Sequence, residues 1–329
     1  MINRKLKKNY FQILQILISV ILLVIIILKY RISLIENVFN LHKPEWLLIS
    51  IILTLFVIPI LAGLRWKIFL IYTGIKESII SLMRINFISI FWGILLPSSD
   101  GFAIIRMFLI EKKYPNKKGI PGSTIIAEKL FGFLLLCLLG IMGSYFITDF
   151  SKIIFTRLVL FLVMLFLIAI VLVITNKILY SMCLKLLNKI SIFKKFISYI
   201  INLHKSITTL PYRKIILRAL PIMLIFQIST IFNVYLIFKA MNVTIPFFYH
   251  IALIPIIQII SLIPITISGF GVREGAFVYF YSLFGIDPST SFSVSIINFL
   301  ILTGVPALIG GLISIFGQIH RKNFIHIQE

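Results

Sequence analysis

The sequence predicts an all-α polytopic membrane protein with about six full transmembrane helices and two oppositely oriented re-entrant hairpins, eight apolar regions in all. Three observations lead to this fold class. Hydrophobic residues make up 60% of the 329 residues and charged residues only 13%, with a mean hydropathy of +1.09, unlike a soluble domain. Several stretches of more than about 18 residues are almost free of charge, enough to cross about 30 Å of hydrocarbon as a helix. Lys and Arg are distributed unequally between the connecting segments.

Six apolar runs are long enough to cross the bilayer as helices, which satisfy their own backbone hydrogen bonds there. The first run follows a basic N-terminus and has no small-x-small cleavage site, so we interpret it as a membrane helix and not as a signal peptide. The six predicted spans are 10–28, 46–64, 121–147, 153–175, 215–238 and 289–316.

Two further apolar regions are each followed by an arm too short to span alone. Residues 79–96 end at "LLPSSDG", and only the apolar stretch 102–110 follows before a basic segment. Residues 249–264 end at "SGFGVREG", and only 275–285 follow before "GIDPST". Each pair predicts a hairpin that enters and leaves on one side, with a tip of Gly, Pro or Ser inside the membrane. Because the two hairpins enter from opposite sides, the arrangement is typical of transporters with inverted repeats.

The positive charges support this topology. With both termini in the cytoplasm, the predicted inner segments contain 21 Lys and Arg and the outer segments contain 6, as the positive-inside rule requires. Treating 79–96 as a full span would reverse every later loop and place 176–214, with eight basic residues and no acidic one, outside. We therefore expect one multi-pass domain, 1–329, in the cell (cytoplasmic or inner) membrane.

The basic segment 176–214 contains a second pattern. From 178 to 201, apolar residues fall on one helical face and most lysines lie off it. This predicts an amphipathic helix on the cytoplasmic surface of the membrane. The net charge of +22 is spread between spans, so we attribute it to orientation and to anionic lipid headgroups, and not to nucleic acid.

Ionisable side chains inside a membrane are costly and therefore mark functional sites by default. The sequence places such residues at the two hairpin tips, on the arms that follow them and at the start of the span 121–147. The candidate substrate-binding residues are Ser98, Ser99, Asp100, Arg106, Glu128, Lys129, Gly269, Gly271, Arg273 and Glu274.

The adjacent Arg273 and Glu274 suggest how the candidates are arranged. Neighbours on a helix point about 100° apart, so we expect each to need a separate partner, with Glu128 and Arg106 completing the pairs. Gly269 and Gly271 leave backbone N–H groups free at a helix start, and such a terminus beside an Arg suits a phosphate. The residues thus predict an anion site within the membrane.

These motifs resemble a known family. "SGFGVREG" looks like the "S-x-G-G-x-G-V-R-E-G" signature of the lysylphosphatidylglycerol synthase transmembrane region, also called the flippase-like domain family. "LLPSSDGFAIIRMFLIEK" and "IIAEKLFGFLLL" resemble two further motifs of the family, in the same order along the chain. Three positions depart from its pattern. Ala103 stands where the family has its acid, so either Asp100 substitutes or the ligand is bound differently. Phe102 stands at the position of the second glycine, and Lys129 replaces an Arg.

The resemblance implies movement of lipids or lipid-linked sugars across a membrane. We expect translocation of an anionic lipid or a polyprenyl-phosphate-linked sugar, with no cofactor and with membrane phospholipids as neighbours. The aminoacyl transferase of bifunctional members has no room after the last span, and the residues contain no metal or nucleophile motif, so we expect no enzyme. Two alternatives remain: a membrane subunit that binds lipid-linked intermediates without moving them, among other membrane proteins of a biosynthetic pathway, and a transporter for a small solute.

Overall fold

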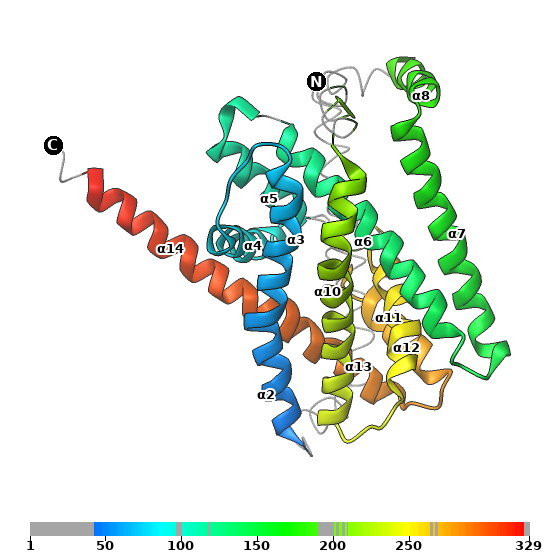
Figure 1. Ribbon diagram of the computed structural model, residues 1–329. Coiled ribbons are helices and arrows are strands. Elements are labelled where there is room, and N and C mark those ends of the chain that lie inside the picture. The colour runs from blue at the N-terminus through cyan, green and yellow to red at the C-terminus, as the bar shows by residue number, and fades with distance from the viewer. Residues whose placement is uncertain are drawn as a thin grey trace, which may run out of the picture.

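The computed structural model describes residues 43–96, 101–117, 119–189, 201, 204–205, 208, 210–263, 266 and 269–325. Over these residues the protein is helical and contains no strand (Figure 1). The elements are α2 (Pro44–Ile52), the π-helix η1 (Leu53–Val57), α3 (Ile58–Ile71), α4 (Ile79–Ile94), α5 (Gly101–Lys113), the 3₁₀-helix η2 (Pro115–Lys117), α6 (Ile120–Ser144), α7 (Phe150–Thr175), α8 (Lys177–Lys189), α10 (Tyr212–Ala240), α11 (Phe247–Ser261), α12 (Val272–Ser282), α13 (Pro288–Phe299), the π-helix η5 (Leu300–Gly304) and α14 (Val305–Ile325).

Five helices in the described residues are long and apolar enough to cross a membrane, which confirms a polytopic α-helical membrane protein. They coincide with five of the six predicted spans, and the predicted span 10–28 lies outside the described residues. The five are Pro44–Ile71, Ile120–Ser144, Ile153–Ile174, Arg213–Ala240 and Pro288–Phe316.

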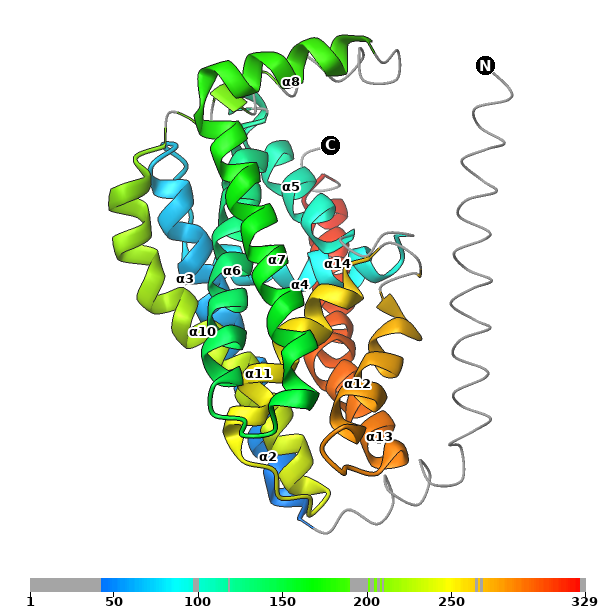
Figure 2. The same ribbon diagram turned by 90° about the vertical axis from the view of Figure 1, so that its right-hand side faces the viewer.

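The first short pair, α4 and α5, packs as a helical hairpin. The two helices approach closely because glycines face each other: a Cβ at Gly93 would lie 2.5 Å from Phe102 N, and one at Gly101 would collide with Gly93 O. The chain reaches α4 from the end of α3 and leaves α5 for the start of α6, both at the end of the molecule where α8 lies (Figures 1 and 2).

A polar cluster closes the base of this hairpin. Lys113 Nζ donates to Glu77 Oε2 at 2.8 Å, and Tyr114 Oη donates to Glu77 Oε1 at 2.9 Å. Burial alone would raise the pKa of Glu77, but the hydrogen bonds from Lys113 and Tyr114 outweigh it and lower that pKa. The ionised carboxylate therefore holds the end of α5 against the chain that leads into α4.

The second short pair, α11 and α12, opens at the opposite end of the molecule, between the end of α10 and the start of α13 (Figures 1 and 2). His250 and Tyr281 join its two arms through a buried hydrogen bond of 2.7 Å between Nδ1 and Oη. On the side of α6, Gly140 and Gly143 allow α11 to approach, since a Cβ at Gly143 would lie 2.9 Å from Ala252 N. Small residues are a common means of close helix packing in membranes.

Helix α8 follows α7 and turns sharply away from it, so that it lies across the end of the bundle (Figure 2). This is the orientation expected of the predicted amphipathic helix. The part of that prediction from 190 to 200 lies outside the described residues, and the position of the helix on a membrane surface stays a prediction.

A buried polar network joins α10 to the first long helix. Asn233 Nδ2 donates to Ser50 O at 3.0 Å and to Thr54 Oγ1 at 2.9 Å, and Ser50 Oγ donates to Asn233 Oδ1 at 3.1 Å. Asn233, Ser50 and Thr54 are all buried. These three hydrogen bonds therefore hold α10 against the helix that contains Ser50 and Thr54.

We expect Asn233→Leu to destabilise the fold by about 1–2 kcal/mol, because Ser50 and Thr54 lose their interhelical partner inside the protein. Thr54→Val removes one of the three bonds and should lower stability less. Thermal unfolding of the purified variants in one detergent measures both. Equal melting temperatures for wild type and Asn233→Leu would contradict a role for this network in holding α10.

Candidate functional site

The first charged centre joins α3, α5 and α6 around a single carboxylate. Glu128 Oε1 lies 2.5 Å from Arg65 Nε, and Glu128 Oε2 accepts a hydrogen bond from Arg106 Nη2. The contact with Arg65 is an ion pair whose angle is not that of a hydrogen bond. Glu128 and Arg106 are buried, and 14% of the Arg65 side chain is exposed. One buried carboxylate thus faces two guanidinium groups.

Aromatic rings hold both arginines in place. The Arg65 guanidinium lies 4.0 Å from the ring centroid of Phe226 on α10, and that of Arg106 lies 3.9 Å from Trp66. Trp66 is in turn fixed by a hydrogen bond of 3.2 Å from Nε1 to Thr124 Oγ1. Cation–π contacts of this kind stabilise a cation that has lost its water.

The second charged centre lies at the start of α12. Arg273 Nη2 donates to Glu274 Oε1, and Glu274 Oε2 accepts from Gly271 N at 2.5 Å. Glu274 is fully buried, while 14% of the Arg273 side chain is exposed and its guanidinium lies 4.6 Å from the Phe299 ring centroid. The expectation that Arg273 and Glu274 cannot neutralise each other is therefore wrong. The Arg273 side chain folds back over Phe299, which brings its guanidinium to its neighbour's carboxylate.

The two glycines before α12 adopt backbone conformations that other residues rarely adopt. Gly269 has φ of +74° and Gly271 has φ of +84°, and a Cβ at Gly269 would lie 2.9 Å from Ser261 O. They allow the chain to turn tightly from α11 into α12. The Gly271 N–H, expected to be free for a ligand, is instead taken by Glu274.

A cavity of about 240 Å³ lies beside Arg273, between α6, α10, α11, α12 and α13 with η5. Several polar side chains line it. Asn298 is buried, and among the described residues neither its Oδ1 nor Nε of Arg273 has a hydrogen-bond partner. The cavity thus offers both a cationic donor and a neutral acceptor to a polar ligand. Its polar lining consists of Thr230, Gln258, Ser261, Arg273 and Asn298.

The two centres lie near each other along α6 and α10. Glu128 belongs to the first centre and Phe133, five residues later on α6, lines the cavity, a rise of about 7–8 Å. Phe226 stacks on Arg65, and Thr230, one turn later on α10, lines the cavity. Between them, Gln227 Nε2 donates to Gly132 O at 3.1 Å. The predicted cross-pairing of the centres is not observed, because each carboxylate has an arginine of its own centre as partner.

The predicted site residues are therefore only partly brought together. Arg106 pairs with Glu128, whereas the prediction paired these two residues with Glu274 and Arg273, and Lys129 is half-buried next to Glu128 on α6. Ser98, Ser99 and Asp100 lie outside the described residues. Arg65 was missed, because the prediction ended its span at residue 64 and assigned the arginine to a cytoplasmic loop. The apolar residues that continue to Ile71 were the signal that the helix does not end there.

Metal ligands do not gather in the described ranges: they contain no group of three or more His, Cys, Asp or Glu side chains that could hold an ion. The charged groups of the two centres are arginine and carboxylate side chains.

Comparison with known proteins identifies related membrane proteins. The family model described as "Lysylphosphatidylglycerol synthase TM region" matches residues 12–310. A UPF0104 membrane protein of Methanocaldococcus jannaschii is 23% identical over 286 residues, which cover 82% of this chain and 83% of the relative. A UPF0104 membrane protein of Methanothermobacter thermautotrophicus is 25% identical over 297 residues, covering 83% and 84%. No solved structure matches the chain.

Proposed function

The chain belongs to the family of the lysylphosphatidylglycerol synthase TM region, and from that premise and the two arginine centres we propose that it translocates an anionic lipid or a polyprenyl-phosphate-linked sugar across the cell membrane. The observation that carries the proposal is Arg273 at the wall of a cavity of about 240 Å³ whose lining combines apolar side chains with a few polar ones. That volume is below the roughly 300–1,000 Å³ of pockets for drug-sized molecules. It suits a headgroup whose hydrocarbon chains stay in the bilayer.

The charges favour an anionic headgroup. Arg273 is held by Glu274 through one terminal nitrogen, and its Nε is a buried donor with no partner in the part of the chain that the structure describes. A phosphate can accept two parallel, charge-assisted N–H bonds from a guanidinium, which are stronger than bonds to a neutral acceptor. The unpartnered Oδ1 of Asn298 can accept from a hydroxyl of glycerol or sugar. A phosphate joined to a polyol would satisfy both the donor of Arg273 and the acceptor of Asn298.

The two hairpins supply a route. In this proposal α4–α5 and α11–α12 are re-entrant from opposite sides of the membrane, since they open at opposite ends of the bundle. The end of the bundle at the basic helix α8 is cytoplasmic in this proposal, as the positive-inside rule favours, and with the predicted span 10–28 both termini are expected on that side. Alternate opening of the two hairpins then exposes the headgroup first to one side and next to the other.

Translocation of a fluorescent phosphatidylglycerol in proteoliposomes tests the site. We expect Arg273→Ala to slow it by at least about tenfold, because a charge-assisted hydrogen bond to the phosphate is lost. Arg273→Lys keeps the charge but lacks the planar guanidinium, so its translocation rate should lie between those of wild type and Arg273→Ala. Arg213→Ala, an exposed residue at the start of α10, is the matched control and should match wild type.

Three outcomes oppose the proposal. Equal rates for wild type and Arg273→Ala would remove Arg273 from the site. Arg273-dependent binding of phosphatidylglycerol without any translocation by wild type would favour a subunit that binds lipid intermediates and does not move them. Translocation of phosphatidylcholine at the same rate would show that the headgroup charge is not recognised.

A further inference from the structure

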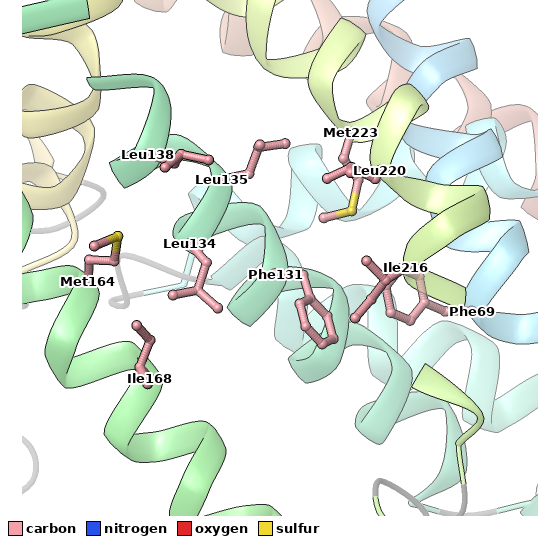
Figure 3. Close-up of a pocket in the computed structure, with 10 residues that line it drawn as sticks. All are labelled: Phe69, Phe131, Leu134, Leu135, Leu138, Met164, Ile168, Ile216, Leu220 and Met223. Carbon is pink, nitrogen blue, oxygen red and sulfur yellow. The ribbon is translucent and has the colours of Figure 1, made fainter. Parts of the chain in front are cut away.

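An apolar groove of about 300 Å³ crosses the outer face of α6, between α7 and α10 (Figure 3). We call it the α6 groove. Every side chain that lines it is apolar. Its floor includes Phe131, Leu134 and Leu138 of α6, and its walls include Met164 of α7 and Leu220 and Met223 of α10. Leu138 and Leu220 are each 46% exposed, so the groove is open at the surface of the protein.

The α6 groove begins one helical turn from the first charged centre on three helices. Phe69 lines the groove and Arg65 precedes it by four residues on α3; Phe131 follows Glu128 by three residues on α6. Met223 precedes Phe226, which stacks on Arg65, by three residues on α10. Residues three or four apart share a helix face. The charged centre and the apolar groove are therefore adjacent, as the charged headgroup and the apolar tail of a lipid are.

Arg65 has capacity for a ligand. It contacts Glu128 through Nε and stacks on Phe226, and 14% of its side chain is exposed. A guanidinium has further N–H donors with which it can bind a phosphate.

We propose that the α6 groove holds one acyl chain of an anionic phospholipid whose phosphate contacts Arg65. The inference rests on the proposed function for its class of ligand, and it adds a second binding position, distinct from Arg273. The surrounding bilayer supplies phospholipid at this surface without any delivery step. If one methylene group occupies about 30 Å³, the volume that a water molecule occupies in the liquid, the groove accommodates about ten methylene groups. That number corresponds to part of one acyl chain and not to a whole lipid.

Photo-crosslinking in nanodiscs tests the groove with the full chain. The probes are phosphatidylglycerol and phosphatidylcholine that carry the same diazirine acyl chain, and the labelled peptides are mapped by mass spectrometry. We expect phosphatidylglycerol to label 131–138 and 216–223 at least about tenfold more than phosphatidylcholine, because the choline cation of phosphatidylcholine offsets its phosphate charge and is repelled by Arg65. Arg65→Gln should abolish that preference.

Filling the groove separates a specific site from ordinary boundary lipid. Leu134→Trp, or Leu138→Trp if the first variant unfolds, should reduce labelling by about tenfold, since excluding two buried methylenes costs about that factor. Leu162→Trp is the matched control: it is exposed on α7 and, two residues before Met164, points to another face. Labelling in this control should equal wild type.

The outcomes also separate this inference from the proposed function. Equal labelling by the two lipids, no effect of either Trp variant in the groove, or labelling by a diazirine polyprenyl phosphate in place of phosphatidylglycerol would overturn the groove assignment, even with Arg273-dependent translocation intact. Groove labelling that follows Arg65 in a protein that translocates no lipid would uphold the groove and reject the proposed function.

Discussion

Glu128→Gln is expected to destabilise the protein by about 3–5 kcal/mol, the usual cost of removing one partner from a buried ion pair. Glu128 is the carboxylate that contacts both Arg65 and Arg106, and Arg106 is almost fully buried. The glutamine keeps the size of the side chain and removes its charge. Both guanidinium groups then lose their shared counter-ion inside the protein. Thermal unfolding of the purified variant, together with its yield from the membrane, measures the effect.

Three comparisons make this expectation specific. Glu45→Gln changes the same residue type at an exposed position of α2 and should leave the melting temperature unchanged. Glu128→Asp retains the charge and should recover part of the loss. Arg65→Met should cost less than Glu128→Gln, because Arg106 still pairs with Glu128. A melting temperature for Glu128→Gln equal to that of Glu45→Gln would show that this centre does not hold α3, α5 and α6 together.

Hydrophobic length was sufficient to predict the spans. Each of the five described spans contains an uninterrupted apolar stretch, and the thickness of the hydrocarbon leaves little choice of element or length. The exception is the end of the first described span, predicted at residue 64 and observed at Ile71. Arg65 did not end the helix because Glu128 and Phe226 stabilise its charge inside the protein. Those partners are far away in the sequence.

Side-chain pairing was predicted less well, for a related reason. Arg106 and Glu128 were both expected inside the membrane and do pair, since two opposite buried charges seldom have an alternative. The partner of Glu274 depended on local geometry that residue spacing does not reveal. The turn at Gly269 and Gly271 brings the Gly271 N–H to Glu274, and Phe299 holds the Arg273 side chain back over the same carboxylate. These contacts involve backbone angles and a ring from another helix.

The second large effect is expected at Gly310, where α14 crosses α4. A Cβ on Gly310 would collide with Phe87 O and lie 2.5 Å from Phe87 C. Both atoms belong to the backbone, so no side chain can rotate to relieve the clash, and the helices must move apart. We expect Gly310→Ala to cost about 1–3 kcal/mol or more, as overpacking does in a close-packed interior. Thermal unfolding in detergent measures this cost.

The displacement should also affect activity, since α4 is one arm of the first hairpin and α5, the other arm, contains Arg106. Gly304→Ala is the matched control in the same long helix, because its Cβ would meet its nearest neighbour, Leu300 Cδ2, at an ordinary 3.7 Å. The control should be neutral or slightly stabilising, as alanine favours a helix more than glycine does. If Gly310→Ala melts and translocates lipid as Gly304→Ala does, α14 does not cross α4 at this glycine, and the hairpin must be held in another way.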